Sequence, residues 1–120
     1  VLGDKNKNII KDENINNIKI RFQKIIDLSP KDLRKLVDEG KNYLKEGIVI
    51  VCASKDDKVG LAVGVTNNLT KDYDAVQLVK VGSEIIGGKG GGGRKDFAQA
   101  GGNKVEMIDE AFKKIRTLIK

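Results

Sequence analysis

Residues 47–65 have the sequence GIVIVCASKDDKVGLAVGV, which predicts the central strands of the fold. Its first part, residues 48–53, is apolar at every position and mostly β-branched, which is typical of an interior strand covered on both faces. A polar turn over residues 55–58 then reverses the chain, which predicts a hairpin. In the second arm, residues 59–65, valine and leucine fill one face and only glycine and alanine fill the other. We therefore expect a helix to pack closely on the second face.

The segment before this hairpin predicts a strand followed by a helix. Apolar and polar residues alternate from Ile18 to about residue 26, as in a strand with one buried face. Ser29 and Pro30 supply an N-cap and a first-turn proline, so a helix is expected to start there and to end near Glu46. Gly47 follows as the expected left-handed residue at the end of the helix.

The segment after the hairpin predicts two more helices and a short strand. Apolar residues at helical spacing indicate a helix over residues 75–86, and a glycine-rich segment, residues 87–93, follows it. Residues 94–100 are interpreted as a short strand, and Asn103 with Glu106 as the capping pair of the last helix. This order predicts an α/β fold, with a sheet of about four to five strands and helices packed on it.

Composition indicates one folded domain. The 120 residues are 39% hydrophobic and 33% charged, which fits a single core. Residues 1–17 carry only isolated isoleucines among Asn and Lys, so we expect a flexible linker or tail there and the domain over 18–120. The chain starts at Val1 rather than Met, which favours a piece of a larger protein. No signal segment or membrane-spanning run is evident, so a cytoplasmic location is expected.

Most familiar catalytic sites are excluded by residue type. The chain has no His and a single Cys, so it cannot form a Ser-His-Asp triad, a Cys-His dyad, an internal disulfide or an ordinary zinc site. Cys52 lies in the most apolar segment and is interpreted as a small buried hydrophobe. We expect no catalytic residue, metal or cofactor in these 120 residues.

Positive charge gathers toward the C-terminus. The formal net charge is +6, and residues 80–120 hold nine basic and five acidic residues. The glycine run is followed by Arg94 and not by the Lys-Ser or Lys-Thr of a nucleotide-binding loop, and a plain connector is the alternative interpretation. Lys89, Arg94 and Lys95 surround the run, and Gly101-Gly102 are expected at a helix N-terminus, which together favour an anion-binding surface. The residues alone thus predict a basic domain that binds phosphate or an anionic polymer.

The run from Gly87 to Gly102, GGKGGGGRKDFAQAGG, resembles the signature near the C-terminus of alanyl-tRNA synthetases, in the DHH-associated domain. Residues 32–38, 47–51 and 59–65 are similar to the first helix and central hairpin of that domain, so the resemblance covers residues 18–120. It implies a C-terminal tRNA-binding domain that tethers the tRNA elbow and supports aminoacylation and editing by a parent ATP-dependent class II enzyme. It also implies that ATP, Mg and Zn belong to other domains of the parent.

The resemblance and the charge pattern together give a set of candidate tRNA-binding residues. The implied partners are tRNA(Ala), the remaining synthetase domains in cis and, as an open state, a second copy in a homodimer, with no membrane contact. The alternatives are the substrate-binding subdomain of a DHH phosphoesterase, in which His follows the glycines, and a dimerisation module. The candidate tRNA-binding residues are Lys89, Gly90, Gly91, Gly92, Arg94, Lys95, Gln99, Lys104, Lys113, Arg116 and Lys120.

Overall fold

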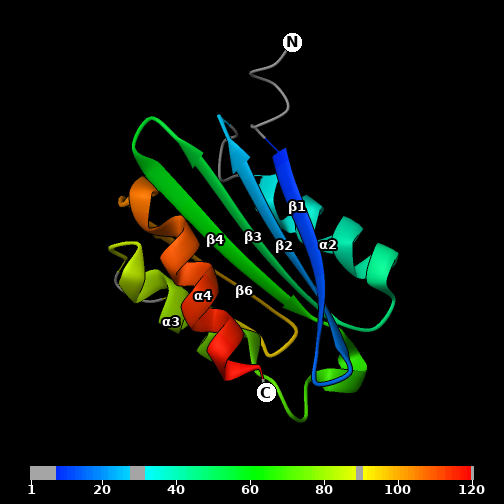
Figure 1. Ribbon diagram of the computed structural model, residues 1–120. Helices are drawn as coiled ribbons and strands as arrows, with labels where there is room; N and C mark the ends of the chain where they lie inside the picture. Colours follow the sequence, from blue (N-terminus) through cyan, green and yellow to red (C-terminus); the bar gives the residue numbers. More distant parts are fainter. Residues whose placement is uncertain (1–7, 28–31, 89–90, 120) are drawn as a thin grey trace.

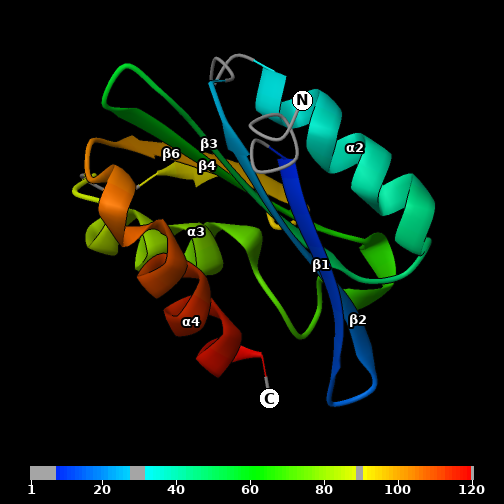
Figure 2. The ribbon, with the colours of Figure 1, turned by 45° about the horizontal axis from the view of Figure 1, so that its top comes forward.

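A computed structural model describes residues 8–27, 32–88 and 91–119. They form a six-stranded sheet in the order β1-β2-β3-β4-β6-β5, with α2 on one face and α3 and α4 on the other (Figures 1 and 2). Among the described strands only β2 and β3 pair in parallel, and α2 lies between them in the sequence. The strands are β1 Asn8–Ile15, β2 Ile18–Ile26, β3 Ile48–Lys55, β4 Lys58–Val65, β5 Gly92–Gly93 and β6 Phe97–Gly102. The α-helices are α2 Leu33–Leu44, α3 Ala75–Ile85 and α4 Ile108–Leu118, and short 3₁₀ turns, η2 and η3, lie at Asn67–Leu69 and Val105–Met107.

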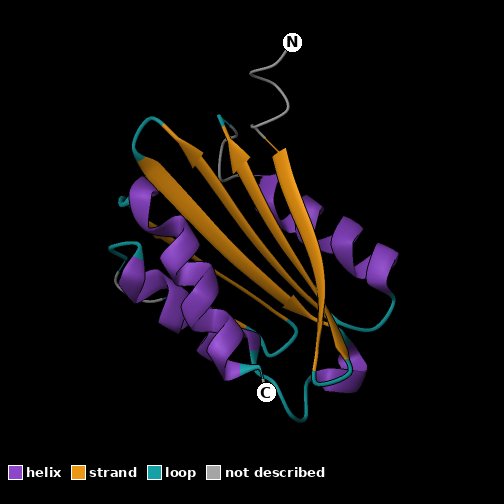
Figure 3. Cartoon of the chain, in the orientation of Figure 1, coloured by secondary structure: helices purple, strands orange, loops and turns teal. Residues whose placement is uncertain are grey.

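The predicted α/β fold is confirmed, with one sheet between two helical layers (Figure 3). The sheet has six strands where four to five were expected, because β1 and the two-residue β5 were not predicted from the sequence. Within the described ranges, none of the helices has the length and apolar character that a membrane crossing requires.

The central hairpin forms as predicted. Every residue of β3 before Lys55 is buried, and β3 pairs with β4 through a turn at Asp56 and Asp57. Both turn residues have positive φ, 52° and 66°, which matches the twist of a two-residue hairpin and which Asp tolerates better than most side chains.

The expectation of a tail is wrong for residues 8–15, which form β1 along the edge of the sheet. Asn16 and Asn17 adopt positive φ, 54° and 65°, and close a second two-residue hairpin onto β2. The strand was not predicted because most of its side chains are exposed, so its sequence lacks the alternation of apolar and polar residues. Polar contacts hold it instead, above all two hydrogen bonds of 2.8 and 3.0 Å from Arg21 to the carboxylate of Asp12. Residues 1–7 lie outside the described residues.

Helix α2 packs on the small-residue face of β4, as predicted. Val37 is fully buried there and lies against Gly64, where an added Cβ would overlap Val37 Cγ1. The left-handed residue after the helix is Lys45, φ 67°, and not Gly47. Gly47 is instead required for close packing, since an added Cβ would overlap the carbonyl oxygen of Lys19. The proposed cap at Ser29 and Pro30 lies outside the described residues.

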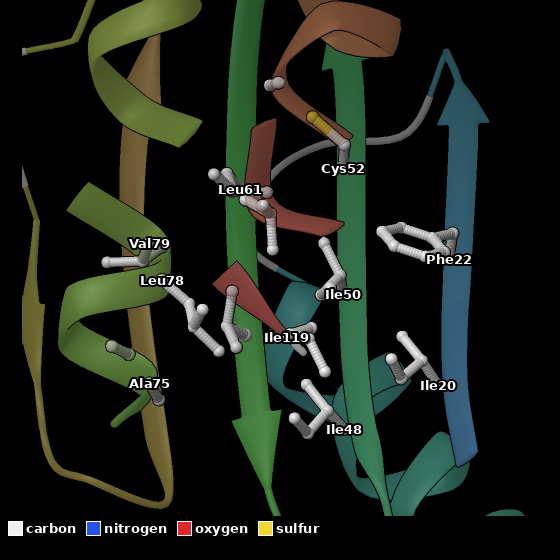
Figure 4. Packing of buried hydrophobic residues seen from close by; sticks show 14 of the residues in the cluster. Ile20, Phe22, Ile48, Ile50, Cys52, Leu61, Ala75, Leu78, Val79 and Ile119 are labelled. Carbon is white, nitrogen blue, oxygen red and sulfur yellow. The ribbon is translucent and has the colours of Figure 1, made fainter. Parts of the chain in front are cut away.

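The larger core lies on the opposite face, between the sheet and α3 and α4 (Figure 4). Ile20, Ile48, Ile50 and Leu61 point from the strands toward Leu78 of α3, and all but Leu78 are fully buried. Cys52 is also in this cluster, and its burial raises the pKa of the thiol to about 12. The interpretation of Cys52 as a buried hydrophobe is therefore confirmed.

The C-terminal boundaries differ from the prediction. Gly101 and Gly102 are the last residues of β6, paired with Gly60 and Val59, and not a helix N-terminus. The amides of Asn103 and Lys104, which follow Gly102, both donate hydrogen bonds to the carbonyl of Ile86. These bonds hold the end of β6 so close to Ile86 that a Cβ added to Gly102 would lie 2.7 Å from Ile86 Cγ1. The capping pair predicted at Asn103 and Glu106 does not form, because η3 precedes α4 and α4 begins without a side-chain cap.

Candidate nucleic-acid interface

The structure divides the predicted tRNA-binding residues among separate places. Gly91, Gly92, Arg94, Lys95 and Gln99 lie together on or next to β5, β6 and the turn between them. Lys95 lies at the start of α3, where its carbonyl accepts a hydrogen bond from the amide of Ala75. Lys104 lies at the end of the same helix, where its amide donates to the carbonyl of Ile86. Lys113 and Arg116 are on α4. Lys89, Gly90 and Lys120 lie outside the described residues.

The turn between β5 and β6 is held rigidly at its backbone. The amide and carbonyl of Arg94 bond to the carbonyl and amide of Phe97, and the Asp96 carbonyl accepts from the amide of Val65 at 2.9 Å. The side chains of Arg94 and Lys95 are exposed, and Arg94 Nε lies 3.4 Å from the Asp96 carboxylate with 67% of its side chain exposed. The turn therefore presents two cations to solvent on a fixed frame, which reduces the ordering cost of binding an anion.

Lys41 of α2 ties the helix to this turn. Its ammonium donates a 2.8 Å hydrogen bond to the Asp96 carbonyl, and its side chain crosses above Gly64. Burial lowers the pKa of Lys41, the carboxylates of Asp96 and Asp38 oppose that shift, and the positive charges of Arg94 and Arg34 add to it. The positive charges of Arg34, Lys41 and Arg94 thus influence one another, and the carboxylates of Asp96 and Asp38 offset them in part.

Arg34 completes this surface. It lies seven residues before Lys41 on α2, so both side chains are on the same side of the helix. Its guanidinium carbon lies 5.3 Å from the centroid of the Phe97 ring. We call Arg34, Lys41, Arg94, Lys95 and Phe97 the α2–turn surface.

Sequence analysis did not select Arg34, Lys41 or Phe97, and the Phe97 side chain is only partly buried. The available signal was the seven-residue spacing of Arg34 and Lys41 beside the residues that bury α2. Their approach to Arg94 could not be read from spacing, since it depends on how α2 packs on β4 and on the pairing of β4 with β6.

A shallow groove extends the α2–turn surface along β6. Its floor is shaped by small residues of β4 and β6, with Gly60 paired to Gly101. Gln99 is exposed on the same face as α2, and Lys58 lines the far end of the groove. The face that the sequence predicted to be nearly free of side chains is therefore only partly covered by α2, and the remainder is open to a ligand.

Packing against β6 explains most of the described glycines in the run. A Cβ on Gly91 would lie 2.6 Å from Ala100 Cβ, and one on Gly93 would lie 2.6 Å from Ala98 Cα. Gly92 differs, because an added Cβ would meet nothing within 4 Å. Gly91 and Gly93 are thus needed for the close approach of the edge strand, whereas Gly92 leaves open space.

The candidate residues Lys113 and Arg116 on α4 do not form a free solvent face. The guanidinium of Arg116 donates to the carboxylate of Glu13 on β1 and lies 4.9 Å from the ring centroid of Phe22. Asp109 pairs with Lys24 at 3.5 Å and not with Lys113, which lies 3.5 Å from Glu110. The charges of α4 therefore serve partly to attach β1 and β2, and they lie across the sheet from α2 (Figure 2).

Comparisons with known proteins agree with the fold and with the resemblance of the glycine-rich run. The model of the DHHA1 domain family matches residues 17–120. An alanine–tRNA ligase of Parvibaculum lavamentivorans is 48% identical over 103 residues, which are 85% of this chain and 12% of the relative. An alanine–tRNA ligase of Hyphomonas neptunium is 41% identical over 108 residues, 90% of this chain and 12% of the relative.

Solved structures show the same relationship. The C-Ala domain of Aquifex aeolicus alanyl-tRNA synthetase superposes with a TM-score of 0.84 at 28% identity, covering 91% of this chain and 97% of that domain. A DHH-domain protein described as a member of a family of ribosomal proteins shares the fold, with a TM-score of 0.57 at 23% identity. That match covers 91% of this chain and 28% of the other protein.

The six-stranded sheet between α2 and the α3–α4 layer, with its glycine-bounded edge, defines a DHH-associated type of α/β domain. The chain belongs to the DHHA1 domain family. The resemblance to the C-terminal domain of alanyl-tRNA synthetases is confirmed, and the chain spans about one eighth of the length of the ligases that it matches.

Proposed function

We propose that this chain is the tRNA-binding C-terminal domain of an alanyl-tRNA synthetase and that it holds the elbow of tRNA(Ala). The observation that carries the proposal is that Arg34, Lys41 and Arg94 all contact residues 96–97 of the α2–turn surface, Arg34 through the Phe97 ring, Lys41 through the Asp96 carbonyl and Arg94 through the Asp96 carboxylate. A phosphate backbone supplies the anions that such a surface favours, with release of condensed counterions on binding.

The shape of the surface favours a folded RNA over a linear one. Phe97 is partly buried and already covered by Arg34, so it offers little area for stacking on a splayed base. The cations stand on a helix and on a turn fixed by hydrogen bonds, so their spacing is constant. A rigid set of cations selects a rigid arrangement of phosphates, such as the corner of a tRNA.

The parent activity follows from the relatives. We propose that the chain supports aminoacylation and editing by an ATP-dependent alanine–tRNA ligase, and that it contributes no catalytic group. The bound nucleotide, Mg and Zn of that ligase would be held by its other domains, which act in cis with this one.

The test is a fluorescence-anisotropy titration of the 120-residue chain with labelled tRNA(Ala) and with unstructured RNA of equal length. We expect tRNA to bind more tightly, and Arg94→Ala/Lys95→Ala to weaken tRNA binding at least about tenfold, because two phosphate contacts are lost. Lys71→Ala/Lys80→Ala removes the same charge from exposed positions elsewhere and serves as the matched control. Equal binding of both RNAs, or an equal loss in the control, would overturn the proposal.

A further inference from the structure

A second hollow, between β1, β2 and α4, is separate from the α2–turn surface. It is lined by Phe22 and Phe112, which belong to the core between the sheet and the α3–α4 layer, so it lies on the opposite face of the sheet from α2, and its volume is about 360 Å³. That volume is at the lower end of the range for small-molecule sites, which suits a ligand no larger than one nucleotide. We call it the β1–α4 pocket.

Aromatic rings and a guanidinium form the inner wall of the β1–α4 pocket. The Phe22 and Phe112 rings have centroids 5.3 Å apart and are tilted by 50°. Phe112 is only partly buried, and Arg116 lies over Phe22. Arg116 Nε is buried and has no hydrogen-bond acceptor among the described residues, so the guanidinium gains a bond if it turns toward an incoming anion. A planar ring with polar edges fits this wall better than an aliphatic chain does.

Lysines form the rim. Lys11 pairs directly with Phe22 across the β1–β2 hairpin, so both side chains point to the α4 face, and Lys24 is two residues further along β2 on that face. Lys113 lines the pocket from α4. Lys24 is partly neutralised by Asp109, whereas Lys11 is exposed and makes no ion pair among the described residues. The rim is therefore suited to a group with negative charge.

We propose that the β1–α4 pocket binds one nucleoside monophosphate unit of RNA, with the base against Phe112 and Arg116 and the phosphate among Lys11, Lys24 and Lys113. Neither half of the pocket suffices for a simpler ligand, because inorganic phosphate leaves the aromatic wall unused and an apolar ligand leaves Lys11 without a counter-charge. Lys24 and Lys113 already lie 3.5 Å from Asp109 and Glu110 and would share those contacts with the phosphate. Lys11 lies on β1, which precedes the residues 17–120 matched by the family model. The site therefore depends in part on a strand outside the matched domain.

The proposal rests on RNA being the ligand of the proposed function, but its test does not use the α2–turn surface. The experiment is a titration of the ¹⁵N-labelled chain with AMP, adenosine and inorganic phosphate, followed by amide shifts. We expect saturable shifts around Lys11, Lys24 and Phe112 with AMP, and binding at least about fivefold weaker for adenosine or phosphate alone. Shifts confined to the α2–turn surface, or no preference for AMP, would overturn the proposal.

Variants separate the two sites. Lys11→Gln should weaken AMP binding about threefold, and the matched control Lys35→Gln, on the exposed side of α2, should not. Phe112→Leu keeps an apolar side chain on the core and should weaken AMP binding at least about fivefold.

Arg34→Ala/Arg94→Ala should leave AMP binding unchanged even where it abolishes tRNA binding. Loss of AMP binding in that variant, with none in Lys11→Gln, would place the nucleotide elsewhere and refute the proposal.

Discussion

Replacing Gly64 with alanine is expected to separate α2 from β4 and to weaken tRNA binding at a distance. A Cβ at position 64 would lie 2.7 Å from Lys41 Cε and would overlap Val37 Cγ1. Val37 is fully buried and β-branched, so one χ1 rotamer is strongly preferred in the helix and we expect α2 itself to shift. Overpacking of this kind costs about 1–3 kcal/mol. For a domain of this size, about 2 kcal/mol corresponds to a fall in Tm on the order of 10 °C.

The same shift moves Lys41 and Arg34 away from the turn between β5 and β6, because both stand on α2 and Lys41 reaches the Asp96 carbonyl over Gly64. Thermal unfolding followed by circular dichroism gives the change in stability, and tRNA anisotropy gives the change in affinity. Gly92→Ala is the matched control, since its added Cβ meets nothing within 4 Å. If Gly64→Ala were as stable as Gly92→Ala and bound tRNA equally well, the close packing of α2 on β4 would not organise the surface as described.

Two further predictions concern the core and the edge strand. Iodoacetamide at pH 8 should leave Cys52 unmodified in the folded chain and modify it readily in denaturant, because burial raises the thiol pKa to about 12. Labelling is measured by mass spectrometry, and rapid labelling of the native protein would contradict this expectation. The hydrogen bond from Arg21 lowers the pKa of Asp12 in the folded chain. The ionised Asp12 therefore stabilises β1 fully above the pKa of Asp in the unfolded chain, about pH 4, and this stabilisation is lost as the pH falls through the lower pKa of the folded chain. Amide protection in β1 should therefore decrease with acid, and Asp12→Asn should remove that pH dependence; an unchanged dependence in the variant would assign it to another group.

The sequence was informative where burial imposes a regular pattern. The hairpin of β3 and β4 and the apolar stripes of α3 and α4 follow from periodicity, because one face of each element is in the core. β1 was missed because an edge strand held by Asp12–Arg21 and Glu13–Arg116 pairs needs little apolar surface. The strand end at Gly101 and Gly102 was missed because glycine has no side chain from which to read a face.

The candidate site was predictable only in part. The charge pattern located Arg94 and Lys95, which are local to the glycine-rich run. It did not locate Arg34 and Lys41, because their contacts with Phe97 and Asp96 arise from the order of strands in the sheet. It also grouped Arg116 with free lysines, whereas its partner Glu13 lies 103 residues earlier in the chain.

The salt dependence of tRNA binding, measured for the unmodified chain and for Arg34→Ala/Arg94→Ala, tests whether the α2–turn surface binds tRNA phosphates. The slope of log K against log salt is negative, and each lost phosphate contact reduces its magnitude by about 1, so the double variant should have a slope smaller in magnitude by about 2. Lys71→Ala/Lys80→Ala should retain the slope of the unmodified chain. An unchanged slope in Arg34→Ala/Arg94→Ala, or an equal decrease in the control, would show that tRNA does not contact this surface.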